Sequence, residues 1–91
     1  MTKNEKFQLI NCINQLEHEA HYGTLTVDNE EFLSIKNNGK YISFIDLEGD
    51  VLEFEIELVT DFTFNTSLKL NRSKMIISLS NGITHIIEVK R

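Results

Sequence analysis

Three histidines and one cysteine are the side chains of this chain best suited to metal binding or nucleophilic chemistry. His18 and His21 lie three residues apart, whereas a zinc-binding helix of the metalloprotease type needs histidines at i and i+4, which share a face. Glu19 would point about 100° away from them on a helix. A third ligand would have to come from His85 or Cys12. A metal-dependent hydrolase built on the three histidines is therefore the third of our hypotheses, and we predict no metal ligands and no cofactor.

Cys12 is the only cysteine, so it can form no disulfide within the chain. A catalytic thiol needs an exposed, electropositive site with a histidine partner. Cys12 instead falls among the apolar residues of a predicted helix, which indicates a buried, unreactive thiol. A lone thiol is typical of a reducing compartment, and we expect a cytoplasmic protein. No catalytic residue is predicted, and we expect the protein not to be an enzyme.

The segment from residue 46 to residue 61 (DLEGDVLEFEIELVTD) contains seven carboxylates and no Lys or Arg. Within it Glu53, Glu55 and Glu57 alternate with large apolar residues, a period of two that predicts a β-strand with one buried and one acidic face. Successive glutamates on such a face lie about 7 Å apart in water. This row is predicted to be a contact surface rather than a pair of catalytic acids.

Composition excludes several classes of protein. The 91 residues predict one domain, residues 1–91, with a net charge of −5. An acidic protein gains little from releasing the counterions of a nucleic acid, so we expect no direct nucleic-acid binding. No segment has the roughly 18–20 consecutive apolar residues that span a bilayer, so no membrane partner is expected.

The first 21 residues predict one amphipathic helix, from about residue 3 to residue 21. Thr2 and Glu5 form a capping box at its start. Leu9, Ile13 and Leu16 recur at helical spacing, and Gly23 is expected to end the helix in the left-handed conformation.

From about residue 24 to residue 89 the apolar period changes to two, which predicts about seven antiparallel strands in a meander. The fold class is therefore α+β, with a strongly bent sheet or a small, partly open barrel. Asp46 and Gly49 indicate a three-residue turn that places Ser43 opposite Glu53. Asn81-Gly82 matches a two-residue turn, which would place Ser78 opposite His85, and both faces of that hairpin are expected to be covered away from the turn.

The stretches GTLTVDNEEFLSI, LVTDFTF and KMIISLSNGITHIIEV, within residues 23–89, carry a resemblance to bacterial pleckstrin-homology-like and GRAM-type domains. Those domains usually close a barrel with a helix after the strands, whereas the helix comes first here. Lipid-binding members have basic residues around the first hairpin loop, and here that loop is Asp28-Asn29-Glu30-Glu31. The resemblance therefore implies a protein-binding member. A small barrel that arose by convergence would show the same pattern.

The favoured hypothesis is a small intracellular domain, an adaptor or inhibitor, that binds a protein partner carrying a basic patch. The predicted contact residues share exposure on the acidic strand face or on the polar side of the helix: Glu53, Glu55, Glu57, Tyr41, Ser43, Phe7, Asn11, Asn14 and His18. The alternative is a small-ligand-binding β-barrel lined by phenylalanines. The protein is expected to be a monomer, or a homodimer formed through an exposed edge strand such as Thr24 to Val27.

Overall fold

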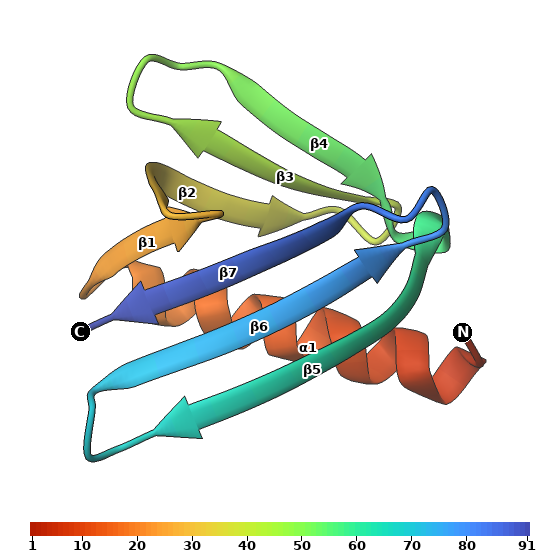
Figure 1. Cartoon of the computed structure of the whole chain (residues 1–91), viewed down its shortest axis with the longest axis horizontal. Coiled ribbons are helices and arrows are strands. Elements are labelled where there is room, and N and C mark those ends of the chain that lie inside the picture. Colours follow the sequence, from red (N-terminus) through yellow and green to blue (C-terminus); the bar gives the residue numbers. More distant parts are fainter.

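One helix packs on a single seven-stranded antiparallel sheet that does not close, so the predicted α+β class with an open, bent sheet is confirmed. The computed structural model describes all 91 residues. Figure 1 shows the helix lying across one face of the bent sheet. The elements in chain order are α1 (Lys3–Ala20), β1 (Thr24–Val27), β2 (Glu30–Asn37), β3 (Tyr41–Asp46), β4 (Val51–Glu55), the 3-10 helix η1 (Ile56–Leu58), β5 (Val59–Ser67), β6 (Arg72–Leu79) and β7 (Thr84–Lys90).

Helix α1 begins at the predicted capping box. The Thr2 hydroxyl accepts the Glu5 amide proton at 3.2 Å, and the Glu5 carboxylate accepts the Thr2 amide proton at 3.0 Å. These bonds satisfy amides that the first turn of a helix leaves free. Leu9, Ile13 and Leu16 are fully buried, which confirms the apolar stripe.

Gly23 was predicted to end the helix in the left-handed conformation, and this was wrong. The positive-φ glycines are Gly39, Gly49 and Gly82, and the C-cap residue after Ala20 is His21, in ordinary right-handed geometry. Gly23 is required for a different reason, because a Cβ there would lie 2.3 Å from the Lys90 carbonyl oxygen. The close approach joins the start of β1 to the end of β7.

The strand order in the sheet is β4-β3-β2-β1-β7-β6-β5. Strand β1 therefore lies in the middle, paired with β2 on one side and β7 on the other. The prediction that Thr24–Val27 is an exposed edge was wrong, because the long-range pairing with β7 covers it. The two edges are β4 and β5, which are consecutive in the chain and are connected by η1 (Figure 1).

The β3–β4 hairpin has the predicted register, with Ser43 opposite Glu53 and Ile42 opposite Phe54. Gly49 has a φ of 88°, and its amide donates to the Asp46 carbonyl at 3.1 Å. The Asp46 carboxylate also accepts the amide protons of Glu48 and Asp50, each at 2.9 Å. This turn fixes which side of β4 carries its glutamates.

The β6–β7 hairpin differs from its predicted register by one residue. A two-residue type I′ turn needs positive φ at both central residues, and of Asn81 and Gly82 only Gly82 has it. The Leu79 amide donates to the Ile83 carbonyl at 2.8 Å, so the loop has three residues. His85 consequently lies opposite Ile77 rather than Ser78. Ile86 faces outward and is 37% exposed, so the expectation that both faces are covered was wrong.

The concave side of the sheet and α1 enclose one apolar core of sixteen buried residues. Phe44 and Phe54 are buried within it, with ring centroids 6.0 Å apart. Phe32, Phe62 and Phe64 pack against this core and are partly buried. The phenylalanines thus fill the interior of the bent sheet with their own side chains.

Candidate protein-binding edge and groove

The acidic face of the β3–β4 hairpin brings together four of the predicted contact residues. The Ser43 hydroxyl donates to the Glu53 carboxylate at 2.7 Å, and the Tyr41 hydroxyl lies 3.5 Å from the Glu55 carboxylate. Glu53 is exposed and Glu55 is half-buried. The ammonium of Lys40 lies 5.5 Å from the centroid of the Tyr41 ring, at the far end of the hairpin from its turn. We call Tyr41, Ser43, Glu53 and Glu55 the acidic edge.

Glu57 does not belong to the acidic edge. Glu53, Glu55 and Glu57 were predicted to lie on one β-strand, but β4 ends at Glu55 and Glu57 lies in η1. Its carboxylate accepts a hydrogen bond from the Lys6 ammonium at 2.8 Å. This bond and the charge of Lys6 lower the pKa of Glu57 below its usual value. The predicted row of three glutamates is therefore a pair, because the negative charge of Glu57 is balanced by Lys6 on the helix.

The other four predicted contact residues with exposed side chains lie on α1. Phe7, Asn11, Asn14 and His18 are all exposed, and Phe7 is 65% exposed. The Asn14 side chain accepts a hydrogen bond from Asn37 on β2 at 2.6 Å. No hydrogen bond or ion pair joins these four residues to the acidic edge, and they follow the exposed side of the helix.

The outer side of β4 presents free backbone groups. In the β3–β4 pair the Asp46 amide donates to the Asp50 carbonyl, and the Ile56 amide donates to the Lys40 carbonyl. Hydrogen-bonded pairs recur at every second residue of an antiparallel ladder. The even-numbered residues of β4 therefore bond to β3. By the same alternation the amides and carbonyls of Val51 and Glu53 point away from β3, and they are free because β4 has no neighbour on that side.

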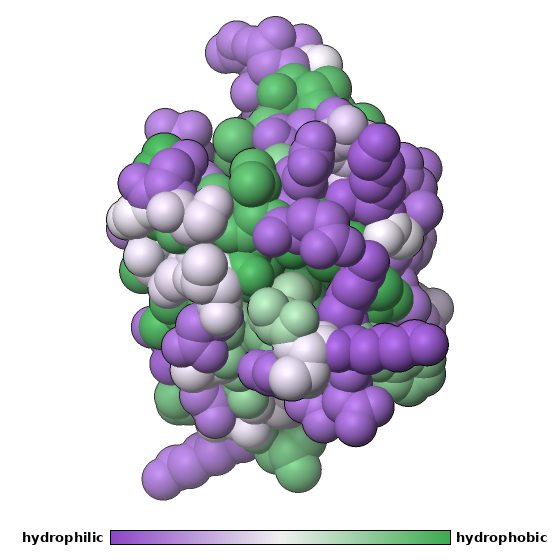
Figure 2. Space-filling model, turned by 90° about the vertical axis from the view of Figure 1, so that its right-hand side faces the viewer, coloured by the Kyte–Doolittle hydropathy of each residue, from purple (hydrophilic) through white to green (hydrophobic).

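A groove of about 520 Å³ lies between β4 and the tip of the β6–β7 hairpin. The Ser80 amide donates to the Leu58 carbonyl at 2.8 Å, which ties the hairpin tip to η1. Figure 2 views the end of the molecule that carries this tip and shows hydrophobic surface exposed between hydrophilic patches. The groove is lined by Tyr41, Leu52, Glu53, Phe54, Glu55, Leu58, Leu79, Asn81, Ile83 and His85.

A histidine held by a carboxylate forms part of the groove wall. The His85 ring stacks on Phe54 with centroids 5.4 Å apart and planes within 4° of parallel. Its Nδ1 lies 2.8 Å from an Asp28 carboxylate oxygen, and the other oxygen of Asp28 accepts the Ile86 amide proton at 2.8 Å. The carboxylate favours a proton on Nδ1. The other ring nitrogen, Nε2, has no hydrogen-bond partner in the structure. The incorrect hairpin register concealed this arrangement in the sequence.

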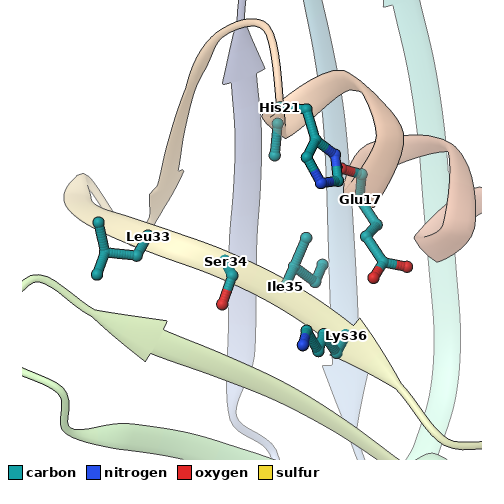
Figure 3. Close-up of a pocket in the computed structure, with 7 residues that line it drawn as sticks. Glu17, His21, Leu33, Ser34, Ile35 and Lys36 are labelled. Carbon is teal, nitrogen blue, oxygen red and sulfur yellow. The ribbon is translucent and has the colours of Figure 1, made fainter.

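A second, smaller hollow lies between the last turn of α1 and β2 (Figure 3). It has a volume of about 140 Å³ and is lined by residues that include Glu17, His21 and Ile35. The His21 Nδ1 lies 2.9 Å from the Glu17 carbonyl oxygen. This hollow is smaller than the roughly 300–1,000 Å³ usual for ligand sites, and we assign it no role.

The structure contains no group of three or more His, Cys, Asp or Glu side chains that could hold a metal ion. His18 and His21 are exposed at the end of α1, whereas His85 is bound to Asp28. Partial burial raises the pKa of the Cys12 thiol, which lowers the fraction of reactive thiolate at neutral pH.

Comparison with known protein families, with curated proteins and with solved structures finds no match to this chain. The resemblance to pleckstrin-homology-like domains therefore stays a prediction. The helix of the structure is not both long enough and apolar enough to cross a membrane.

Proposed function

We propose that this protein acts by binding a protein partner through the acidic edge, as an adaptor or inhibitor, without chemistry of its own. The observation that carries the proposal is the unpaired charge of Glu53 and Glu55. The carboxylates of Glu19, Glu57 and Glu88 each have a basic partner within 4.0 Å, whereas Glu53 and Glu55 have none.

The surrounding turn strengthens this negative field. Glu48 and Asp50 are exposed in the β3–β4 turn, and the segment from residue 46 to residue 61 has no basic residue. Complementary charge across an interface speeds association and fixes orientation. A basic patch on the partner is therefore the chemistry that the acidic edge would recognise.

The test is a double charge reversal, Glu53→Lys with Glu55→Lys. The matched control is Glu31→Lys with Asp61→Lys, which changes the net charge equally at two exposed positions outside the acidic edge. Affinity purification from the native cell should retain a salt-sensitive set of proteins with wild type and control, and lose that set with the E53K/E55K variant. If wild type and E53K/E55K retain the same proteins with the same salt dependence, the proposal is wrong.

A second candidate function is the binding of a small apolar ligand in the groove. Its volume of about 520 Å³ is the observation that favours this function, because it lies within the usual range for ligand sites. The filled core leaves no place for the ligand inside the bent sheet. Native mass spectrometry of protein purified from its own cell would test this, and the expected result is a bound small molecule that is lost in His85→Ala.

A further inference from the structure

We infer that the acidic edge and the groove together bind one extended segment of the partner, which adds a strand to β4 and alternates basic with apolar residues. This inference rests on the proposed function and specifies the partner's chemistry. Strand addition to a free sheet edge is a recurrent mode of peptide recognition, in which backbone hydrogen bonds supply affinity and alternate side chains supply specificity.

The backbone of β4 is the first element of this site. Val51 and Glu53 direct their amide and carbonyl groups away from β3, toward the side where the sheet has no further strand. An added strand would pair with these groups as β3 pairs with Leu52 and Phe54. The tie between Ser80 and Leu58 closes one end of the groove, so the segment would extend from there past Val51.

The side chains of β4 determine the alternation. Successive residues of a strand face opposite sides of a sheet, and a neighbouring strand continues both faces. Side chains of the segment on the outward face would lie beside Glu53 and Glu55, where a basic residue gains a cross-strand charge pair. Side chains on the opposite face would enter the groove and contact Leu52, Phe54 and Ile83, where apolar residues bury most surface.

A second copy of this chain does not fit the site. Pairing of β4 with β4 would place glutamates of like charge beside one another, which is unfavourable. The other free edge, β5, has the sequence VTDFTFNTS and supplies no basic side chain. Both edges of the sheet therefore lack the cations that the acidic edge needs, and the occupant must be a different protein.

The probe is a blocked synthetic peptide of about eight residues, close to the usual length of a strand, that alternates Lys and Val. The control peptide has the same composition, with its lysines and valines in separate blocks. A third peptide has the alternating sequence with N-methyl groups on the amides of one edge. Binding is measured by calorimetry and by ¹⁵N NMR titration of the full chain.

The protein variants separate backbone pairing from charge. Val51→Pro removes one free edge amide but keeps every carboxylate, and proline is tolerated at the start of an edge strand. Val51→Ala shortens the same exposed side chain and keeps the amide, so it is the matched control. Glu53→Gln with Glu55→Gln removes the charge and keeps the strand.

The alternating peptide should bind the wild-type chain, shift the amide signals of Val51 and Glu53, and bind Val51→Pro about tenfold more weakly than Val51→Ala. The block and N-methyl peptides should also bind about tenfold more weakly than the alternating one. Since the N-methyl peptide needs no change in the protein, a folding defect of Val51→Pro would leave the test intact.

Three results would overturn the inference. If all three peptides bind equally well and lose affinity equally with E53Q/E55Q, charge alone accounts for binding. The proposed function then stands, and strand addition is wrong. If no peptide binds the wild-type chain, or if binding is unchanged in E53Q/E55Q, the groove is not a site for a basic strand. If binding is unchanged in E53Q/E55Q, the charges of the acidic edge do not contribute to binding, and the proposed function is wrong as well.

Discussion

Substitution of Gly23 tests how the start of β1 packs against the end of β7 in the middle of the sheet. The Cβ of Gly23→Ala would lie 2.3 Å from the Lys90 carbonyl oxygen and 2.9 Å from its carbonyl carbon. Carbon and oxygen atoms in contact need more than 3 Å, so the backbone of β1 or β7 must move. A movement of the end of β7 would strain the hydrogen bond from the Arg91 amide to the Asn71 carbonyl, at 2.8 Å.

Overpacking of this kind costs about 1–3 kcal/mol. For a domain of this size each 1 kcal/mol lowers Tm by about 4–8 °C. A cost near 2 kcal/mol would then lower Tm by about 8–16 °C. Circular dichroism or calorimetry measures the change, and urea denaturation gives the free energy of unfolding.

The decisive comparison uses asparagine, which tolerates positive φ. Gly39 has a φ of 86° with open space where a Cβ would lie, so Gly39→Asn should change Tm little. Gly23→Asn should be as damaging as Gly23→Ala, because its defect is steric. If Gly23→Asn is as stable as wild type, the close approach of β1 and β7 is not what requires glycine there.

Two further predictions concern charged groups. The Glu19 side chain is 8% exposed, with one oxygen 3.4 Å from Arg91 and the other without a hydrogen-bond partner. Arg91→Ala should therefore lower the free energy of unfolding, measured by urea denaturation, by about 1–3 kcal/mol. The double variant with Glu19→Gln should regain part of that free energy. If it regains none, the pairing of Glu19 with Arg91 does not account for the loss. For Glu57, the Lys6 ammonium lowers its pKa below the usual 4.5 in the folded state. The folded state then binds fewer protons than the unfolded state, so this stabilisation is full above the usual pKa and is lost as pH falls through the lowered one. The difference in urea midpoint between wild type and Lys6→Gln should accordingly be present near pH 7 and vanish near pH 2, and a difference that persists in acid would show that Lys6 acts by packing.

Elements that depend on residues close together in the chain are predictable from the sequence. The capping box of Thr2 and Glu5, the helical stripe and the Asp46–Gly49 turn are local, and all three are confirmed. The β6–β7 turn is not predictable in this way, because Asn81-Gly82 fits two loop lengths whose strand registers differ by one residue. Because of this one-residue difference in register, His85 lies on the side of the sheet where it contacts Phe54.

The candidate site shows the same division. The outward orientation of Glu53 and Glu55 follows from the period of two and the turn before β4. The loss of Glu57 from that row depends on η1 and on Lys6, which lies 51 residues away in the chain. No pattern within the segment from residue 46 to residue 61 indicates that contact.

The amino-acid sequence by itself therefore determined the helix, the strands and the acidic side of β4, because side-chain period and turn conformation act over a few residues. The tertiary structure alone decided that β1 is central, that β4 and β5 are the free edges, and that a groove lies beside the acidic edge. Those features arise from pairing between β1 and β7, at opposite ends of the chain. Long-range pairing depends on the summed fit of all the strands, which no local pattern encodes.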